Sequence, residues 1–352
     1  MHPSRQFSGV KPGLAQELTG FTGTPKMFRS RFRDEVNEGV TKLYSAKQIR
    51  DIRMQLLNIP ADTKRPLTLP PIINFRMAKG GVGKSTKAGN VASCLALSGY
   101  RVLAIDGDPQ ASLTTLFGID WTEAEITHIG MLIERQGSDA PVNPEKAVWS
   151  IYPDGMLDLI PADISMANDS WMISKMNGVS LFKQLLQKQI AFFSQYDVIV
   201  IDSAPGSSLL ATSFMVASDI ITAVINPEGQ SLAALEVLAS NVEEINRAFE
   251  RKKDPLDVLI VVNRYNQSKK PHNVALSKLA AKYPGKVADT VVRDFIGFIR
   301  EVDPDNLHAN GPVFEREPTS AGARDVIDLT KILVRSYGIK LAGVDPLGRA
   351  SA

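Results

Sequence analysis

The sequence predicts an α/β fold in which a mainly parallel sheet is covered by helices on both faces. Short runs of β-branched and apolar residues recur along the chain, and amphipathic stretches of helical period lie between most of them. Runs without polar alternation are typical of strands buried on both faces, and strands that alternate with helices form parallel sheets. The chain has 352 residues and is 44% hydrophobic, which is enough for one large core and a small accessory region.

Seven apolar runs are predicted as strands, and they span residues 72–77, 101–105, 157–160, 197–201, 220–225, 258–262 and 287–292. The carboxyl ends of parallel strands meet at one edge of a sheet, and ligands bind at that edge in folds of this class. We therefore expect the functional side chains to follow these runs directly.

The chain divides into five predicted parts: a flexible lead (1–24), a helical region (25–59), a proline-rich linker (60–71), the main α/β domain (72–340) and a disordered tail (341–352). The lead is rich in Gly, Ser, Thr and Pro and shows no period. In the helical region, Ser45 followed three residues later by Gln48 predicts a capping box at the start of a second helix. The linker contains four prolines and no helical period.

Positive charge is concentrated at the amino-terminal end. Residues 1–70 carry a net charge of +6, whereas the rest of the chain carries −4. The second predicted helix contains Lys47, Arg50 and Arg53. Two short helices with these basic residues could form a DNA-binding unit similar to a helix-turn-helix. A helical arm used for dimer packing fits the same spacing equally well, so both interpretations stay open.

The cysteine and histidine content excludes several classes of protein. Cys94 is the single cysteine and the four histidines are scattered, so neither a disulfide framework nor a metal-ligand cluster is expected. This composition indicates a reducing, cytoplasmic environment. No amino-terminal signal pattern and no apolar run of membrane-spanning length is present, so we expect neither secretion nor membrane insertion.

The strongest motif is the glycine-rich segment 80–86, which follows the first predicted strand and opens a helix. Glycines at a helix amino terminus let backbone N–H groups point at phosphates without obstruction. Lys84 then supplies a charge to the β- and γ-phosphates, and Ser85 offers a hydroxyl to Mg²⁺. The motif predicts a fold of the P-loop NTPase type that binds ATP and Mg²⁺, although the first glycine of the general pattern is replaced by Ala78. The predicted nucleotide-binding residues are Lys79, Gly80, Gly81, Val82, Gly83, Lys84, Ser85 and Thr86.

The segment from Lys79 to Ser85 resembles the deviant Walker A motif of the ParA/MinD family, and the likeness extends over residues 71–338. In that family the extra lysine crosses to the nucleotide of a partner subunit, so the resemblance implies that Lys79 builds an ATP-dependent homodimer. A cation supplied in trans would make dimerisation depend on the γ-phosphate. The alternative interpretation of Lys79 is an exposed lysine in a loop.

Two acidic motifs lie where the family has them. Asp106 and Asp108 belong to an Asp-Gly-Asp-Pro-Gln segment after the second strand, and Asp202 ends a strand in the manner of a Walker B element. The resemblance implies that Asp106 and Asp202 hold Mg²⁺ through water and that Asp108 positions the attacking water, with Lys79, Lys84 and Asp108 as the catalytic residues. The alternative for the first segment is a turn opened by an aspartate and fixed by proline.

Further residues are assigned by resemblance or by charge. Asn263 ends a predicted strand where the family has an asparagine that reads the adenine edge, although it could simply terminate the strand. The candidates for a DNA-binding face on the main domain are Lys269, Lys270, Arg293 and Arg300. A solvated surface explains each of these four residues as well as DNA binding does.

The choice of biological role depends on what the chain lacks. One cysteine cannot hold the cluster of the iron-protein branch, and glycine and proline in the tail prevent the amphipathic membrane helix of the MinD branch, so no membrane partner is expected. The partition branch remains. It implies a cytoplasmic, nucleoid-associated ATPase that is weak alone, binds DNA nonspecifically as an ATP dimer and is stimulated by a ParB-type partner. The alternatives are an operator-binding autorepressor with a nucleotide-sensing core, and a positioning ATPase for a protein cargo.

Overall fold

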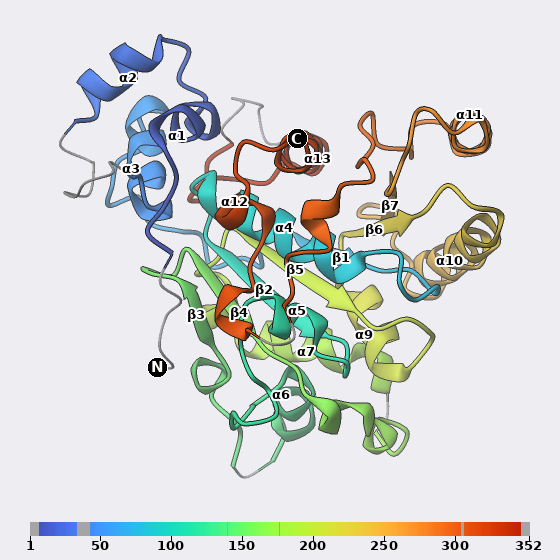
Figure 1. The fold of residues 1–352 in the computed structure, drawn as a ribbon. Helices are drawn as coiled ribbons and strands as arrows, with labels where there is room; N and C mark the ends of the chain where they lie inside the picture. Colours follow the sequence, from blue (N-terminus) through green and yellow to red (C-terminus); the bar gives the residue numbers. More distant parts are fainter. Residues whose placement is uncertain (1–6, 34–42, 139, 176, 304–305, 346–352) are drawn as a thin grey trace.

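The core of the molecule is one seven-stranded sheet with the order β3-β4-β2-β5-β1-β6-β7 (Figure 1). The computed structural model describes residues 7–33, 43–138, 140–175, 177–303 and 306–345. Every neighbouring pair is parallel except β3 and β4, which are antiparallel. The strands are β1 (Ile72–Phe75), β2 (Val102–Gly107), β3 (Trp149–Tyr152), β4 (Leu157–Ile160), β5 (Val198–Ser203), β6 (Ile220–Ile225) and β7 (Asp257–Val262).

Six of the seven predicted strands are confirmed. The segment 287–292 is not a strand: it runs beside β7 and forms an isolated bridge between Val287 and Ile260. The prediction also missed β3, because this edge strand has only four residues, the first two are partly exposed, and Ser150 interrupts its apolar run. A short edge strand lacks the continuous apolar run that identifies the buried strands.

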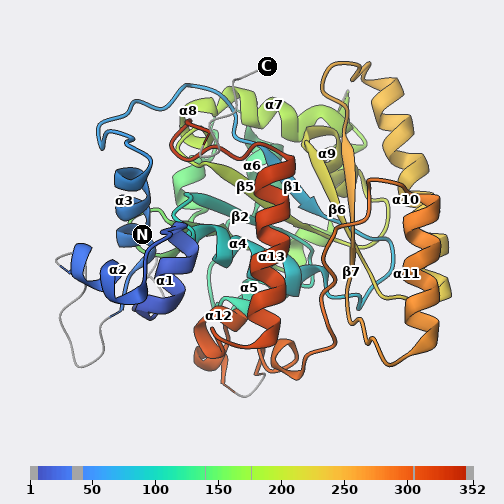
Figure 2. The ribbon, with the colours of Figure 1, turned by 90° about the horizontal axis from the view of Figure 1, so that it is seen from above.

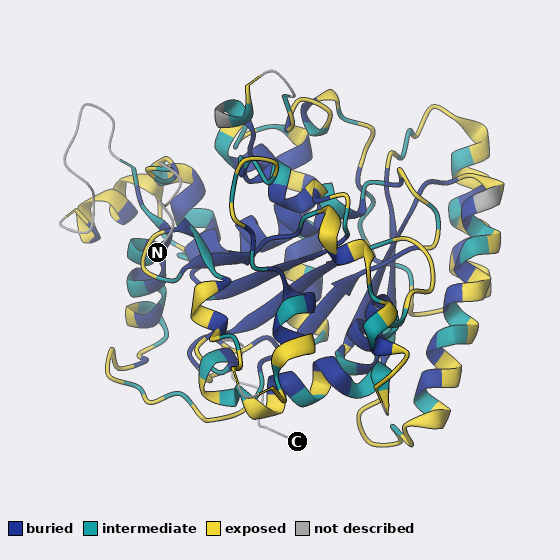
Figure 3. Cartoon of the chain, turned by 90° about the horizontal axis from the view of Figure 1, so that it is seen from below, coloured by how far each residue is buried: buried dark blue, intermediate teal, exposed yellow. Residues whose placement is uncertain are grey.

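Helices cover both faces of the sheet, as predicted (Figures 2 and 3). In β5, Val198 and Val200 contact one hydrophobic cluster and Ile199 and Ile201 contact the other, and all four are fully buried. The first cluster lies under α4 (Lys84–Leu97) and α13 (Ala321–Ser336), and the second under α6, α7 and α9. The other helices are α1 (Pro12–Thr19), α2 (Pro25–Arg31), α3 (Ala46–Leu56), α5 (Ser112–Leu116), α6 (Ile129–Arg135), α7 (Leu181–Lys188), α8 (Ile190–Phe193), α9 (Leu209–Ala217), α10 (Gly229–Ala248), α11 (Lys270–Lys282) and α12 (Val313–Arg316).

The amino-terminal region is a three-helix unit that packs against the main domain (Figures 1 and 2). Its second predicted helix begins as expected, because Ser45 and Gln48 form both hydrogen bonds of a capping box. The predicted flexible lead is wrong over residues 12–19, which form α1 and bury Leu14 and Leu18 in the core. Proline at the first helical position and glycine after the last one give α1 its ends.

The linker and part of the tail are also attached to the domain. Arg65 of the linker forms an ion pair with the buried Asp197 (2.7 Å) and donates a hydrogen bond to the carbonyl of Gln195. The predicted disordered tail is wrong over residues 341–345, because Leu341 is buried and forms a bridge with Val344. Residues 346–352 lie outside the described residues. No helix in the described ranges is long and apolar enough to span a membrane.

Candidate nucleotide site

The glycine-rich loop connects the carboxyl end of β1 to the amino terminus of α4, as the motif predicts. Gly81 (φ 71°) and Gly83 (φ 89°) adopt left-handed backbone conformations that side chains disfavour. A Cβ atom on Gly83 would lie 2.7 Å from the side-chain nitrogen of Asn263, whereas one on Gly81 would meet open space. Gly83 is the N-cap of α4 and supplies no side-chain cap. The first N–H groups of α4 are therefore not capped by a side chain, which is the arrangement that binds phosphate at helix termini.

Lys84 brings a buried positive charge to this loop. The residue is 6% exposed, and burial lowers the pKa of its amine while Asp202 and Asp108 partly offset that effect. A buried cation is stabilised by an anion close by. The triphosphate of a nucleotide would supply that anion together with the α4 amino terminus.

The acidic residues of the two predicted motifs meet at the ends of adjacent strands. Asp106 on β2 pairs in register with Asp202 on β5, and both are fully buried. Asp106 accepts hydrogen bonds from the backbone N–H (2.8 Å) and hydroxyl (2.7 Å) of Thr114. Burial raises the pKa of Asp106 to about 6, and these hydrogen bonds oppose the rise. Burial, followed by the charge of Asp106, raises the pKa of Asp202 well above its usual range.

The Asp202 carboxylate fits a divalent cation. Both of its oxygens are buried and have no hydrogen bond of normal geometry to any described residue, although the Ser85 hydroxyl is near enough to lower the pKa of the carboxyl group. A buried acceptor without a donor requires a partner, and Mg²⁺ with its waters would provide one. No group of three His, Cys, Asp or Glu side chains among the described residues could hold a metal by itself. Mg²⁺ needs only one or two carboxylates when phosphates and water complete its shell.

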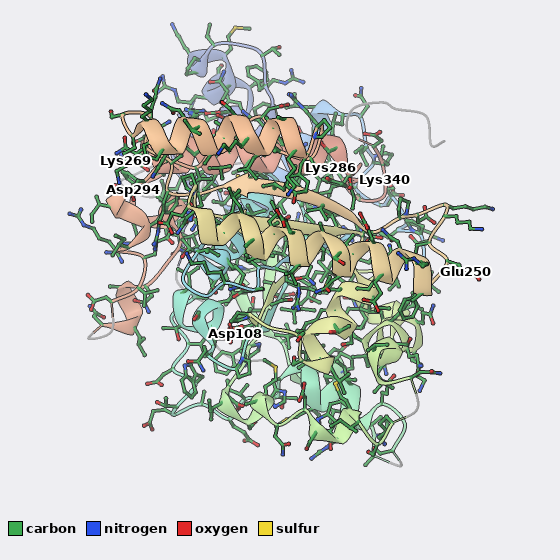
Figure 4. The ribbon with its side chains drawn as sticks, turned by 90° about the vertical axis from the view of Figure 1, so that its right-hand side faces the viewer. Asp108, Glu250, Lys269, Lys286, Asp294 and Lys340 are labelled. Atoms are coloured by element: carbon green, nitrogen blue, oxygen red, sulfur yellow. The ribbon has the colours of Figure 1, made fainter. Side chains whose placement is uncertain are left out.

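Asp108 lies beside these residues, where the attacking water is predicted to bind. It is 8% exposed, its backbone N–H donates to Asp106 (3.1 Å), and its carboxylate accepts from the N–H of Gln110 (3.0 Å). Figure 4 shows Asp108 well apart from Lys269, which lies at the start of α11. The structure therefore brings Lys84, Asp106, Asp108 and Asp202 together, and the role of Asp108 toward water stays a prediction.

Asn263 supports the phosphate loop directly, which the sequence did not indicate. Its side-chain N–H donates to the carbonyl of Val82 (2.8 Å), and its buried side-chain oxygen has no hydrogen-bond partner in the part of the chain that the structure describes. This contact crosses from the end of β7 to the loop after β1 and fixes the loop against the sheet. Contact with adenine stays a prediction for Asn263.

Two charged residues at the loop have contacts that sequence reasoning missed. Lys79 forms an ion pair with Glu228 (3.1 Å), next to the start of α10, and both side chains are partly exposed. Arg76, directly after β1, is 4% exposed and donates hydrogen bonds to the carbonyls of Ala204 (3.4 Å) and Gly206. An arginine between an apolar strand and a phosphate loop was the available signal for the second residue.

Arg50 is buried and Arg53 is partly buried, and both contact the main domain, which their assignment as DNA-binding candidates did not anticipate. Arg50 is 5% exposed and binds the carbonyl of Gly99 (2.6 Å) and the carboxylate of Asp197 (2.7 Å). Arg53 donates to the carbonyl of Ser98 (2.5 Å) and its guanidinium lies over the ring of Tyr100. Both arginines therefore attach α3 to the main domain. Lys47 is partly exposed and forms an ion pair with Asp51 on the same helix.

The other DNA-binding candidates lie on the surface. Lys269, Lys270 and Arg300 are exposed. Arg293 is also exposed, but two of its guanidinium nitrogens donate to Asp325 (2.8 Å each). Part of its hydrogen-bonding capacity is thus used within the chain, and DNA binding by these four residues stays a prediction.

Comparisons with known proteins place this fold and site in a family. The family model described as AAA domain matches residues 71–255, just over half of the chain. The cell division protein PomZ of Myxococcus xanthus is 27% identical over 283 residues, which cover 80% of this chain and 82% of PomZ. The virulence plasmid ParA family protein pGP5-D of Chlamydia psittaci is 27% identical over 263 residues, which cover 73% of this chain and 92% of that protein.

A solved structure shows the same fold. The putative plasmid partition protein of Borrelia burgdorferi B31, bound to AMPPNP, matches with a TM-score of 0.60 at 22% identity and covers 76% of this chain and 99% of that one. The family model spans the phosphate loop and both acidic motifs. The chain therefore belongs to the ParA family of ATPases.

Proposed function

We propose that this protein hydrolyses ATP with Mg²⁺, dimerises when ATP is bound, and uses this cycle to segregate DNA. The observation that carries the proposal is the convergence of Lys84 and the buried Asp202 carboxylate on the uncapped amino terminus of α4. This arrangement supplies a cation and helix N–H groups for the phosphates and an acceptor for the metal shell. Ser85, Asp106 and Asp202 would hold Mg²⁺, which would neutralise charge on the phosphates. Asp108 would orient the attacking water.

Dimerisation requires Lys79 to leave its present partner. The ion pair with Glu228 joins side chains that are 29% and 58% exposed. Exposed pairs contribute about 0–1 kcal/mol, so a γ-phosphate on a partner subunit could compete successfully for this lysine. Glu228 therefore defines a resting position for Lys79 in the monomer.

DNA binding by the ATP dimer would use the exposed basic residues of the main domain. These residues are Lys269, Lys270 and Arg300. A ParB-type partner would stimulate ATP hydrolysis and thereby release the protein from DNA. Phosphate contacts of this kind predict affinity that falls steeply with salt. We propose a cytoplasmic, nucleoid-associated location on the same basis.

A positioning ATPase for a protein cargo is the second candidate. The use of Arg50 and Arg53 to attach α3 removes two of the residues that would read an operator, and a relative of similar length is a cell division protein. The autorepressor alternative is weakened by the same two contacts. Binding of random DNA by the ATP form favours segregation, whereas ATP-dependent binding to a protein without DNA binding favours positioning.

The first experiment measures the molar mass by light scattering in ADP·Mg²⁺ and in ATP·Mg²⁺. Wild type is expected to double its mass in ATP alone, and Lys79→Ala is expected to stay monomeric. Lys269→Ala, an exposed lysine away from the loop, is the matched control and should dimerise like wild type. A wild type whose mass does not respond to ATP would contradict the dimer switch.

A further inference from the structure

Arg76 is a buried cation that has no acidic partner among the described residues. Burial lowers the pKa of its guanidinium to about 10, and no carboxylate in the described ranges lies within ion-pair distance to offset this cost. The group nevertheless remains protonated at neutral pH. A buried charge that lacks a counter-charge is strongly unfavourable, so the position calls for an anion.

The position of Arg76 relates it to the metal and phosphate residues. Phe75, the last residue of β1, pairs with Asp202 on β5, so Arg76 lies one residue beyond this pair. The positive charge of Arg76 is also close enough to lower the pKa of Lys84. Arg76 and Lys84 therefore approach the same edge of the sheet, at which the triphosphate is expected.

The same guanidinium holds the turn that follows Asp202. Its two terminal nitrogens donate to the carbonyls of Ala204 and Gly206, which lie in the connection between β5 and α9. Residues 205–208 of this connection are exposed, and Gly206 has a left-handed backbone (φ 99°). Guanidinium has five N–H groups in a planar fork, so these two bonds leave donors for a further acceptor.

We propose that Arg76 binds the terminal phosphate of ATP and, through its hydrogen bonds to Ala204 and Gly206, orders the turn after Asp202 when that phosphate is present. The inference rests on the proposed function only in requiring that the site binds ATP. The phosphate supplies the missing counter-charge, and one rigid fork then joins it to two backbone carbonyls. With ADP, the carbonyls alone hold the guanidinium. Arg76 is thus a positioning residue that couples binding of the γ-phosphate to ordering of the turn.

The test compares the affinities of AMPPNP and ADP, each with Mg²⁺, for the full chain by calorimetry. Arg76→Gln is expected to weaken AMPPNP by about tenfold or more and ADP by less than about threefold, because charge-assisted hydrogen bonds to the terminal phosphate are lost. Arg251→Gln is the matched control. Arg251 is a mostly buried arginine that donates to the carbonyls of Val216 and Ser218, just before the amino end of β6. Its substitution should leave the affinities for both nucleotides unchanged.

Hydrogen exchange of the backbone amides in residues 204–208 gives a second readout. In wild type, AMPPNP should protect these amides more than ADP does. Arg76→Lys keeps the charge but not the fork, so it should retain the preference for AMPPNP and lose the extra protection. This variant decides the matter if Arg76→Gln does not fold.

Equal weakening of both nucleotides in Arg76→Gln, or unchanged AMPPNP-dependent protection in Arg76→Lys, would overturn the proposal. Failure of the proposed function is distinguishable. A wild type that binds AMPPNP but neither dimerises nor binds DNA would contradict the function and leave the role of Arg76 standing. A wild-type protein that binds no AMPPNP would contradict both the proposed function and the proposed role of Arg76.

Discussion

Asp197, directly before β5, joins four separate segments of the chain through one carboxylate. One oxygen accepts from Arg65 (2.7 Å) and the N–H of Ala342 (2.9 Å), and the other accepts from Arg50 (2.7 Å) and the N–H of Arg101 (2.8 Å). The amino-terminal unit, the linker, the start of β2 and the tail therefore meet at this point. We predict that Asp197→Asn destabilises the whole chain.

The magnitude follows from the contacts. Asparagine is neutral, and its NH₂ group must face two donors whichever way the amide is turned. The Asp197 and Arg50 side chains are 1% and 6% exposed, so the substitution leaves a buried guanidinium without its counter-charge. Removing one partner of a buried ion pair costs about 3–5 kcal/mol, and because Arg65 is more exposed we expect about 3–4 kcal/mol here.

Urea unfolding followed by tryptophan fluorescence measures this free energy. Asp120→Asn is the matched control, because Asp120 lies at the surface and accepts hydrogen bonds from Thr122 that asparagine can also accept. The control should unfold like wild type. A loss below about 1 kcal/mol in Asp197→Asn would refute the reasoning, since the buried cation would then have found another partner. Cleavage of the linker by protease at low urea should rise in parallel.

Three further predictions concern single side chains. Burial raises the pKa of Asp158 to about 6, so protonation of its carboxyl group stabilises the fold fully below the unfolded pKa of about 4, and this stabilisation is lost as pH rises through 6. Thermal unfolding should therefore show that Asp158→Asn is more stable than wild type at pH 7, by up to about 3 kcal/mol. At pH 4 the two proteins should be equally stable. Asp202→Asn should bind AMPPNP without the strengthening by Mg²⁺ that wild type shows, and an unchanged Mg²⁺ effect in titrations would place the metal elsewhere. Asn263→Ala should weaken ADP and AMPPNP equally, by about three- to tenfold, because the Val82 carbonyl loses its donor; loss of preference for ATP over GTP would instead support contact with adenine.

The main domain was predictable because its signals are local. Each buried strand is a continuous apolar run, and the glycines of the phosphate loop occur in one short segment whose spacing is itself the chemical signal. The register that places Asp106 beside Asp202 needed only the parallel order of β2 and β5. By contrast, β3 is short and partly exposed, and its antiparallel pairing with β4 depends on contacts that local periodicity does not encode.

Counting positive charges in α3 was a poor guide to DNA binding, because the count ignored the face of the helix on which each side chain lies. Arg50 lies four residues after Ala46, and Arg53 four residues after Ile49, so both arginines lie on the face that the helix buries. The spacing could therefore have identified them as packing residues. What the spacing could not provide is the counter-charge, since Asp197 is 147 residues from Arg50 in sequence.

Attachment of the amino-terminal unit has a consequence for the nucleotide cycle. Arg50 and Arg53 bind the carbonyls of Gly99 and Ser98, directly after the carboxyl end of α4, whereas the nucleotide is expected at the amino end of the same helix. Cations at a helix carboxyl terminus interact favourably with its dipole, so the two arginines stabilise α4. The basic residues that suggested DNA binding therefore support, in this structure, the helix that carries the phosphate loop. A chain that lacks residues 1–59 should consequently lose both stability and nucleotide affinity. If this unit were instead a detachable DNA-binding arm, its deletion would leave both properties unchanged.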